Sequence, residues 1–534
     1  MKERLRDTEE QVEEIYWPEN IVEKLTELYP DKGEFVCAAG ATPSGNVHVG
    51  NFRDIITSDL VCRALKEKGF KAELIFSWDE FDRLRKIPPN IPSSFSKYLG
   101  IPLTEVPDPF QCHNSYARHF ESEFEEALSQ LGIYPRFIYQ SEEYQNNRYY
   151  RGIKKALQER KKIAKILGSF RTQGMTEKEV EEYYPLQVYC RNCRRSTTTR
   201  VVSYDGEDKI KYACKCGRSE IVDISKENVG KLGWKIDWAM RWQYEGVNFE
   251  PGGADHAVAG GSYDVAKKIA EEVFGIQPPL FQGYAFVGFQ GVAKMSSSRG
   301  TGITLKKALE IYEPEIIRWI FCKKSPEDSI TLSFGPEVIR AYEEFDRMVG
   351  DYHQGTLAPL ERKIIEFSSV VASKPPPKRE LSFRQVAAFG QIVQGNFQEL
   401  MKMYERLGIK VDEEVLKIRL KKSKVWIDEF VPELKIKLRG SPNRDYYEKL
   451  SQEEKEQIKR LVRELDNCWI LEKLTGLLYE IPKKPSYSEE EVRVAQKRFF
   501  ENLYQMLIDS DTGPRLSTFL IALGKEKIKE LLDV

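Results

Sequence analysis

The stretch 41–51 contains residue types that suit the binding of a phosphate group between a strand and a helix. It reads Ala-Thr-Pro-Ser-Gly-Asn-Val-His-Val-Gly-Asn, follows an apolar run at 35–39 and precedes a segment with helical spacing of its apolar residues. A helix N-terminus offers unpaired N–H groups to an anion, and Gly45 and Gly50 let the backbone come close to it. His48 would then donate a hydrogen bond to the phosphates. An ordinary glycine-rich loop with a surface histidine is the alternative.

A second stretch, 293–300, has the composition of a flexible phosphate clamp. It follows a strand-like run at 280–288 and contains two cations, a methionine, three serines and a glycine: Lys294, Met295, Ser296, Ser297, Ser298, Arg299 and Gly300. A lysine ammonium supplies a mobile point charge. The serine hydroxyls can donate to phosphate oxygens and cap a following helix. A flexible polar loop is the alternative.

Four of the nine cysteines form two close pairs, Cys190 with Cys193 and Cys214 with Cys216. Two such pairs supply four thiolates, which hold Zn²⁺ tetrahedrally without a large core. The second pair is closer than the common spacing of two intervening residues, so four incidental cysteines are the alternative. The remaining cysteines are expected to be packing residues: Cys37, Cys62, Cys112, Cys322 and Cys468.

A second strand is predicted at 72–77, and a cluster of acidic and basic residues follows it. Asp79, Glu80 and Asp82 stand beside two arginines, Arg83 and Arg85. Ligands of open α/β sheets lie at the carboxyl ends of the strands. The sequence therefore places these charges close to a ligand.

Two basic segments are candidate nucleic-acid contacts. Residues 151–165 hold seven basic residues and one acidic residue and are predicted to form one amphipathic helix with a positive face. Residues 416–424 hold five basic residues. They lie in a carboxyl-terminal half that is predicted to be helical throughout beyond about residue 330. A solvated helix face is the alternative for each segment.

Length and composition describe a multidomain protein of ordinary solubility. The 534 residues suggest about three domains, since single cores stop growing near ~250–300 residues. The net charge of −1 arises from 82 basic and 83 acidic residues. A protein with this balance that binds nucleic acid must gather its basic residues on one part of its surface. There is no long apolar run, and the charged start of the chain lacks the apolar core of a signal peptide, so a cytoplasmic protein is expected.

The two phosphate stretches together resemble the two signatures of class I aminoacyl-tRNA synthetases. Residues 48–51 resemble the first signature and residues 294–298 the second. Further segments resemble the class I lysyl-tRNA synthetase family within that class, over nearly the whole chain. They are the Pro43-Ser44-Gly45 lead-in, Asn51, the segment 78–86, the run Gly260-Gly261-Ser262-Tyr263, and Asp511-Thr512-Gly513-Pro514-Arg515.

The resemblance implies that lysine and ATP form lysyl-adenylate, and that the lysyl group then passes to the terminal adenosine of tRNA(Lys). It implies ATP with Mg²⁺ at the turn, neither DNA nor a membrane as partner, and a catalytic set of His48, Asn51, Lys294, Ser296, Ser297 and Ser298. The implied ATP-binding residues are Pro43, Ser44, Gly45, His48, Gly50, Asn51 and Met295. Asn51 replaces the usual second histidine, and Ser297 replaces the usual second lysine.

The resemblance also implies residues that bind lysine: Gly40, Thr42, Trp234, His256 and Tyr284. The ε-ammonium requires an anion, which Asp79, Glu80 or Asp82 can supply. Spacing does not choose among the three, and Asp79 is the one included in the lysine-binding set. A glutamyl-type synthetase would need a cation there, and Arg83 and Arg85 keep that alternative open. A non-catalytic tRNA-binding relative is the other alternative.

The expected fold is an α/β, Rossmann-like parallel-sheet catalytic domain with a zinc-ribbon-like insertion, followed by an all-α anticodon-binding half. The expected boundaries are a helical lead-in at 1–30, a catalytic domain at 31–330 and a helical region at 331–534. The insertion is expected at 87–225, with its cysteine-rich module at about 185–225.

Overall fold

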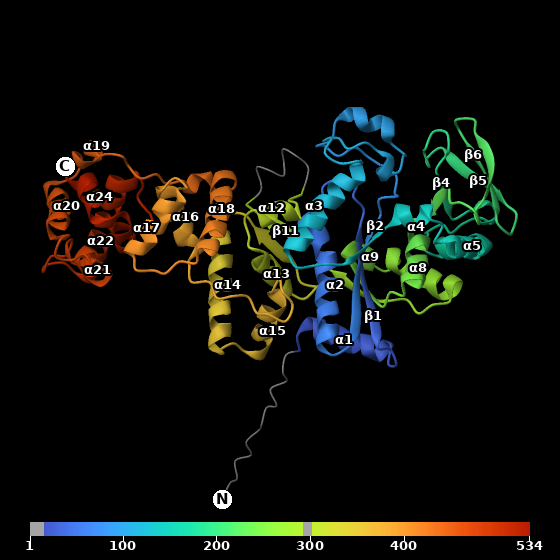
Figure 1. The fold of residues 1–534 in the computed structure, drawn as a ribbon, viewed down its shortest axis with the longest axis horizontal. Helices are drawn as coiled ribbons and strands as arrows, with labels where there is room; N and C mark the ends of the chain where they lie inside the picture. Colours follow the sequence, from blue (N-terminus) through green and yellow to red (C-terminus); the bar gives the residue numbers. More distant parts are fainter. Residues whose placement is uncertain (1–14, 292–301) are drawn as a thin grey trace, which may run out of the picture. The chain divides into compact units, whose positions relative to one another are not determined.

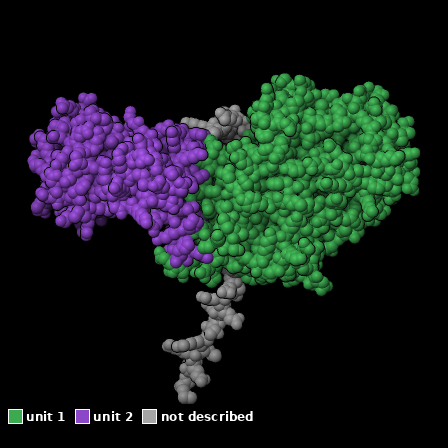
Figure 2. All heavy atoms as spheres, in the orientation of Figure 1, with its two compact units in different colours: residues 1–332, 354–376 green, residues 333–353, 377–534 purple. Residues whose placement is uncertain are grey.

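The computed structural model describes residues 15–291 and 302–534. The second phosphate stretch, 293–300, lies outside these described residues. The chain divides into two compact units, one of residues 1–332 with 354–376 and one of 333–353 with 377–534 (Figure 2). The helical region expected at 331–534 thus contributes α15 (Pro359–Ser368) to the first unit, where the Arg318 guanidinium donates to the Phe367 carbonyl.

A five-stranded parallel sheet forms the centre of the first unit (Figure 1). Its order is β10 (Leu280–Tyr284), β9 (Phe249–Gly253), β1 (Glu34–Ala41), β2 (Lys71–Trp78) and β3 (Arg136–Tyr139). The chain winds outward from β1 through β2 to β3 and then returns to the other side of β1. Strand order therefore reverses between β1 and β9, the place in such sheets where ligands bind. The predicted α/β parallel-sheet class is confirmed.

Helix α2 (Val49–Glu67) is buried along most of its length because it packs among several elements. Arg53 is 2% exposed and donates to the carbonyls of Ala285, Ser325, Pro326 and Asp328. Four acceptors replace the water that this guanidinium loses on burial. Arg53 therefore fixes α2 to the segment that follows β10.

The predicted strand at 280–288 is in fact two strands. β10 ends at Tyr284, and β11 (Val287–Gln290) pairs with β12 (Ile330–Ser333) in a separate sheet. The Ala285 amide donates to the Pro326 carbonyl between them, so the chain leaves the central sheet at this point.

The span 87–225 does not form a single insertion. β3 lies within it and pairs with β2 in the central sheet, and α3 (Tyr116–Gln130) packs against β2 through Phe124 and Trp78. The cysteine-rich module itself is an antiparallel sheet of β5 (Thr199–Tyr204), β6 (Lys209–Cys214) and β7 (Ser219–Asp223). β4 (Leu186–Val188) and β8 (Gly230–Leu232) pair beside it.

The basic segment 151–165 is two helices, α5 (Tyr150–Gln158) and α6 (Arg160–Ser169), which meet at Glu159. The prediction of one continuous helix is therefore wrong. Much of its charge is neutralised within the first unit. Lys154 pairs with Asp208 at 3.0 Å, and Lys161 pairs with Glu181 at 2.6 Å.

The second unit consists of packed helices. They include α14 (Glu337–Gln354), α16 (Phe383–Ile392), α17 (Phe397–Arg406), α18 (Glu413–Glu429), α20 (Gln452–Glu464), α21 (Leu471–Glu480), α22 (Glu489–Ile508), α23 (Leu516–Leu523) and α24 (Lys525–Leu532). The chain turns between α16 and α17 at Gln394 and Gly395, which both have positive φ. Within the described ranges, every helix is too short or too polar to cross a membrane.

Candidate functional site

A cleft of about 980 Å³ lies at the carboxyl ends of β1, β9 and β10. The end of β1 contributes Gly40 and Ala41, and the following turn contributes Thr42, Ser44, His48, Gly50 and Asn51. The other side is formed by Asp79, Asp82, Arg83, Trp234, Gly253, His256 and Tyr284. The cleft therefore contains the first phosphate stretch and the residues expected to bind an amino acid.

His48 is the N-cap of α2 and has extended backbone geometry. The Asn51 side-chain oxygen accepts the His48 backbone N–H at 3.3 Å, and the Asn51 N–H donates to the His48 carbonyl at 2.9 Å. Burial lowers the pKa of the imidazole. The side chain is therefore neutral near pH 7 and acts as a dipolar donor rather than as a cation.

Two glycines make room for the His48 ring. A Cβ at position 50 would lie 2.7 Å from both Nδ1 and Cε1 of the ring, and one at position 302 would lie 3.0 Å from the His48 Cβ. The Val49 N–H donates to the Ile303 carbonyl at 2.9 Å, and His48 forms a β-bridge with Thr304.

The residues on either side of the second stretch also line the cleft. Val287 and Phe289 of β11 precede that stretch, and Gly302 follows it. Both flanks of the second stretch thus reach the cavity that holds the first.

An inner pocket of about 80 Å³ shares residues with the cleft and contains carboxyl groups. Asp54, in the first turns of α2, accepts the Gly40 N–H at 3.2 Å and the Tyr284 hydroxyl at 3.0 Å. Glu250 accepts the Trp242 indole N–H at 2.6 Å. Burial and the neighbouring Glu250 raise the pKa of Asp54 well above its ordinary value. The surroundings of this carboxyl group thus disfavour its negative charge, and a cation beside it would favour that charge.

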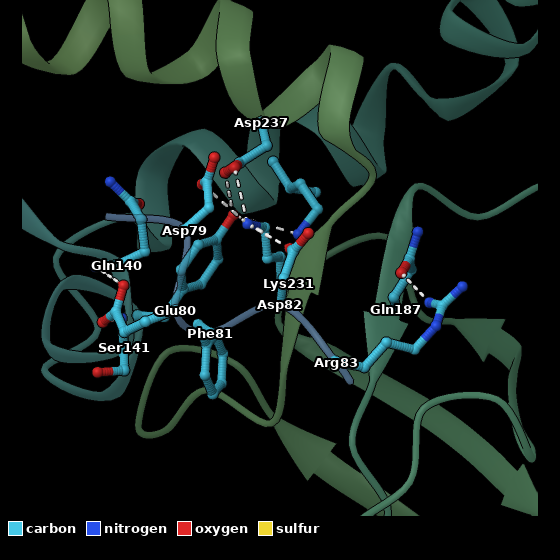
Figure 3. Close-up of polar contacts among 12 residues, drawn as sticks. Asp79, Glu80, Phe81, Asp82, Arg83, Gln140, Ser141, Gln187, Lys231 and Asp237 are labelled. Carbon is cyan, nitrogen blue, oxygen red and sulfur yellow. Dashed lines mark hydrogen bonds and ion pairs between the residues drawn. The ribbon is translucent and has the colours of Figure 1, made fainter. Parts of the chain in front are cut away.

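The three acids that follow β2 are engaged in other contacts (Figure 3). The Lys231 ammonium lies 3.2 Å from Asp79 and 2.7 Å from Asp82. Arg241 pairs with the same Asp79 oxygen at 3.0 Å. Asp79 therefore lines the cleft while two buried cations already neutralise it.

Glu80 points away from the cleft. Its carboxylate accepts the backbone N–H groups of Gln140 and Ser141 at 3.0 and 2.7 Å, at the N-terminus of α4 (Gln140–Gln145) (Figure 3). Burial raises the pKa of Glu80 to about 7. Glu80 therefore joins the end of β2 to α4.

Aromatic rings form one wall of the inner pocket. Trp234 stacks on Trp238 with ring centroids 5.1 Å apart and planes inclined by 18°. Trp238 also contacts the His256 ring edge-to-face at 5.9 Å. The rings of α8 (Trp234–Glu245) thus form an apolar surface beside the carboxyl groups.

The four cysteines of the two pairs come together in the module. Cys190 and Cys216 have sulfurs 3.6 Å apart, as do Cys193 and Cys214, and the four sulfurs lie within 4.8 Å of one another. A tetrahedral Zn²⁺ with Zn–S bonds of about 2.3 Å sets its sulfurs about 3.8 Å apart. The residues present therefore fit a structural zinc ion.

Sequence reasoning missed Asp54, Glu250, Lys231 and Arg241. Asp54 had a detectable signal, because it is three residues beyond Asn51 and shares the exposed face of the first helical turns. Lys231 and Arg241 come from β8 and α8, far from Asp79 in the chain, and no local pattern pairs them. Gly40, Thr42, Trp234, His256 and Tyr284 are all brought to the cleft.

Several known proteins resemble this chain over nearly its full length. Lysine–tRNA ligase of Pyrococcus horikoshii is 34% identical, covering 96% of this chain and 98% of the relative. The lysine–tRNA ligase of Treponema pallidum is 35% identical, covering 97% of this chain and 98% of the relative. That of Streptomyces coelicolor is 33% identical, covering 94% of this chain and 95% of the relative.

Among solved structures, a glutamate tRNA ligase from Elizabethkingia meningosepticum aligns with 94% of this chain and 99% of its own at 12% identity and a TM-score of 0.43. The family model described as tRNA synthetases class I (K) matches residues 15–371, which include the sheet, the cleft and the cysteine-rich module. The chain belongs to this family of class I tRNA synthetases.

Proposed function

We propose that the protein is a lysine–tRNA ligase, which activates lysine with ATP and transfers the lysyl group to the terminal adenosine of tRNA(Lys). One observation carries the proposal. A single cleft at the β1/β9 switch point contains the first phosphate signature, both flanks of the second, and a carboxyl-lined inner pocket with an aromatic wall. In addition, the relatives of this chain that are named lysine–tRNA ligases align with almost all of it.

The turn before α2 would hold the ATP phosphates. Its donors would be the Gly50 N–H, between the Val49 and Asn51 N–H groups that bind Ile303 and His48, and the neutral His48 ring. Ser44, Gly50 and Asn51 line the cleft, and Pro43 and Gly45 would shape the turn that presents them. When bound, Mg²⁺ would offset phosphate charge. The lysine carboxylate attacks the α-phosphorus and pyrophosphate departs, so positioned donors and cations contribute most of the acceleration.

The second stretch would stabilise the departing pyrophosphate. We assign Lys294 as its main cation, with hydroxyl donation from Ser296, Ser297 and Ser298, and backbone contact from Met295 to ATP. The support is that residues 287–289 and Gly302, on the two sides of this stretch, line the same cleft as His48.

For the lysine ε-ammonium we assign Asp54, assisted by the Tyr284 hydroxyl. Asp79, the sequence-based candidate, is already paired with Lys231 and Arg241. Asp54 instead accepts hydrogen bonds from the Gly40 N–H and the Tyr284 hydroxyl and has the acidic Glu250 as its charged neighbour. Trp234 would lie along the methylene groups. The end of β1 at Gly40 and Thr42, together with His256, would contact the amino and carboxylate groups.

The charges in the pocket favour lysine over glutamate. A glutamate side chain would need an available cation. Arg241 is held by Asp79 and Asp237, and Arg85 pairs with Asp82 at 2.8 Å. Arg83, which donates to Gln187 at 3.0 Å, and Lys86 line the outer cleft and not the inner pocket. The carboxyl groups of Asp54 and Glu250 would repel a second acid.

Transfer RNA would contact the helical second unit, which we assign to anticodon binding. Exposed lysines of α18, Lys421 and Lys424, are the candidate phosphate contacts. Arg419 belongs to the same basic run but is fully buried and pairs with Asp346 at 2.7 Å, so its role is to hold the helices together.

ATP–pyrophosphate exchange with each amino acid, in the absence and then in the presence of tRNA(Lys), tests the proposal. We expect exchange with lysine. Exchange with glutamate alone would replace the assignment by a glutamyl-type enzyme. The absence of exchange with every amino acid, even with tRNA present, would point to a non-catalytic relative.

A further inference from the structure

A groove of about 520 Å³ lies wholly within the second unit. It is lined by α16 and α18, which lie side by side, and by the segment 435–437 (Figure 1). Its volume is in the range of small-ligand pockets, about 300–1,000 Å³. Lys424, one of the candidate phosphate contacts, lies on its rim. The groove is therefore a second concave surface, separate from the catalytic cleft.

The floor of the groove is apolar, and it is open because the residues of α16 that face it are small. Gly390 lets the two helices approach closely, since a Cβ there would lie 2.5 Å from the Leu420 Cδ1. Ala387 and Ile427, which are 5% and 4% exposed, continue the floor on the two helices. The short side chains of α16 thus leave an aliphatic surface on which the face of a ring can lie.

Two glutamine amides border this floor and have different roles. Gln391 is held in place, because its side-chain oxygen accepts the Ile436 N–H at 2.8 Å and its nitrogen donates to the Ala387 carbonyl at 3.3 Å. Gln394 is exposed, and within the described ranges its side-chain amide makes no hydrogen bond. Its φ of 52° is uncommon for a residue other than glycine. Such backbone positions cluster at ligand sites, and here one presents an available donor and acceptor to the groove.

The rim of the groove is positively charged. Three exposed lysines line it, Lys424 from α18 and Lys435 and Lys437 from the segment beyond that helix. Asp428 is the acid among the lining residues, and it pairs with Lys435 at 2.7 Å. Lys424 and Lys437 have no ion-pair partner in the part of the chain that the structure describes. Two ammonium groups therefore remain available to an anionic ligand.

An aliphatic floor, an available amide and two unpaired cations together match the parts of a nucleotide. The face of a base is apolar, its edge carries donors and acceptors, and its phosphates are anionic. In a duplex both faces of a base are stacked on neighbouring bases, so only an unstacked nucleotide could lie on the floor. An acidic peptide would also meet the lysines, but it would leave the aliphatic floor and the Gln394 amide without a matching group.

We propose that this groove binds one unstacked nucleotide from a single-stranded part of tRNA(Lys). The base lies on Leu420 and Ile427 with its edge at the Gln394 amide, and the phosphates on either side of it meet Lys424 and Lys437. The inference rests on the proposed function, which supplies the RNA. It adds to that function a defined base-binding site between α16 and α18.

The salt dependence of tRNA binding tests the phosphate contacts. The affinity of the full-length protein for a tRNA(Lys) transcript is measured by fluorescence anisotropy at several salt concentrations. Each phosphate contact to a single strand contributes about 0.7 to the slope of log affinity against log salt, so Lys424→Ala/Lys437→Ala should lower the slope by about 1.4. Lys24→Ala/Lys71→Ala also removes two exposed lysines, one from α1 (Trp17–Leu28) and one from the start of β2, and should keep the wild-type slope.

Gln394→Gly tests the base contact without loss of stability. Glycine suits the positive φ of this position, so the variant should melt at or above the wild-type temperature while it lacks the side-chain amide. The probes are 15-nucleotide oligouridylate, oligoadenylate and oligocytidylate, and a 15-base-pair RNA duplex. The wild type should bind one single strand more tightly than the duplex, and Gln394→Gly should bind that strand about fivefold more weakly with an unchanged salt slope. Ser373→Gly, at another exposed position of positive φ, is the matched control.

A wild-type salt slope in Lys424→Ala/Lys437→Ala, or wild-type affinity for the preferred strand in Gln394→Gly, would overturn the nucleotide site. Binding of the duplex as tightly as every single strand would overturn it too. These measurements need neither ATP nor amino acid, so they are distinct from failure of the proposed function, in which lysine-dependent exchange is absent. Absent exchange together with the expected RNA effects would keep the groove as a nucleotide site and reject the lysine assignment.

Discussion

Asp54 links two strand ends at the inner pocket through hydrogen bonds to its carboxyl oxygens. It accepts hydrogen bonds from the end of β1 through Gly40 and from the end of β10 through Tyr284. Its pKa is raised because burial and Glu250 both disfavour a second negative charge. An ammonium group beside Asp54 would reverse this balance, which is the physical basis on which we assign Asp54 to the lysine side chain.

Asp54→Asn should therefore raise the KM for lysine at least about 100-fold, because it leaves the ammonium without a charged partner. In the wild type, lysine binding should release protons and strengthen as pH rises from the ordinary carboxyl pKa toward the raised one. The variant should lose that dependence. Exchange kinetics measure the KM, and isothermal titration of lysine at several pH values measures the pH dependence of binding, with exposed Asp31→Asn as control.

The same variant separates binding from folding. A carboxyl group with a raised pKa in the folded state contributes stability that is present below its unfolded pKa and is lost as pH rises through the folded value. At neutral pH, Asp54→Asn should thus unfold at a denaturant concentration no lower than the wild type. A large loss of stability would attribute its kinetic defect to misfolding.

Lys294→Ala tests the second phosphate stretch. Removal of the cation that we assign to the departing pyrophosphate should lower kcat for lysine-dependent exchange by about 100-fold or more, while the KM for lysine changes little. Lys267→Ala, on the exposed side of α10 (Ser262–Ile269), is the control for loss of one positive charge. Exchange at the wild-type rate would remove Lys294 from the mechanism.

At the scale of elements, the N-terminus of α2 is shaped by what surrounds it. Asn51 and His48 close the first turn, and Thr304 and Ile303 pair with its start after the chain has travelled through most of the first unit. Pro88 lies against Gly45, where a Cβ would be 3.3 Å from the proline ring. The turn is therefore held from several sides before any ligand arrives.

Gly50→Ala separates helix stability from the position of His48. Alanine is favoured over glycine within a helix by about 0.5–1 kcal/mol, so the helix itself should not weaken. The new Cβ would overlap the His48 ring and displace it. We expect kcat/KM for ATP to fall by between about 10- and 100-fold. Gly33→Ala, with no atom within 4 Å of the added Cβ, should have normal kinetics.

β8 has a corresponding role at the opposite wall of the cleft. Lys231 stands on this short strand next to the cysteine-rich module and holds Asp79 and Asp82 at the end of β2. Arg194 of the module pairs with Glu105, and Arg195 donates to the Leu99 carbonyl. The module is thus attached by polar contacts to the segment 99–105, which follows the cleft-lining Arg83 and Arg85 in the chain.

At the scale of the whole molecule, the two units have separate cores. The cleft, the four-cysteine cluster and the carboxyl-lined pocket belong to the first unit. The run 511–515 lies between α22 and α23 of the second unit. There, Gly513 leaves space for the Tyr504 ring, and Tyr504 donates to the Pro514 carbonyl. The run 511–515, which resembles the family, therefore contributes to the packing of the helices around it.

Charge reversal on the second unit should affect tRNA rather than the small substrates. The double variant Lys421→Glu/Lys424→Glu should raise the KM for tRNA(Lys) in aminoacylation about tenfold or more at low salt, and the difference should shrink as salt rises, because phosphate contacts release counterions. kcat at saturating tRNA should be retained. Exposed Lys497→Glu on α22 is the control. An unchanged KM would move the tRNA contact to another surface.

The sequence by itself determined the main helices and strands and the types of side chain that line the cleft. Local spacing was sufficient for β1, α2 and α18, and for the pairing of cysteines into one ligand set, because helical and strand periodicity and metal-ligand spacing are local properties. The tertiary structure decided which charges remain available. Asp79 and Asp54 are both acids near a strand end. Only the packing of β8 and α8 against β2 gives Asp79 its two cations and leaves Asp54 to face the pocket. The free energy of a charge depends on every group around it, and those groups come from distant parts of the chain.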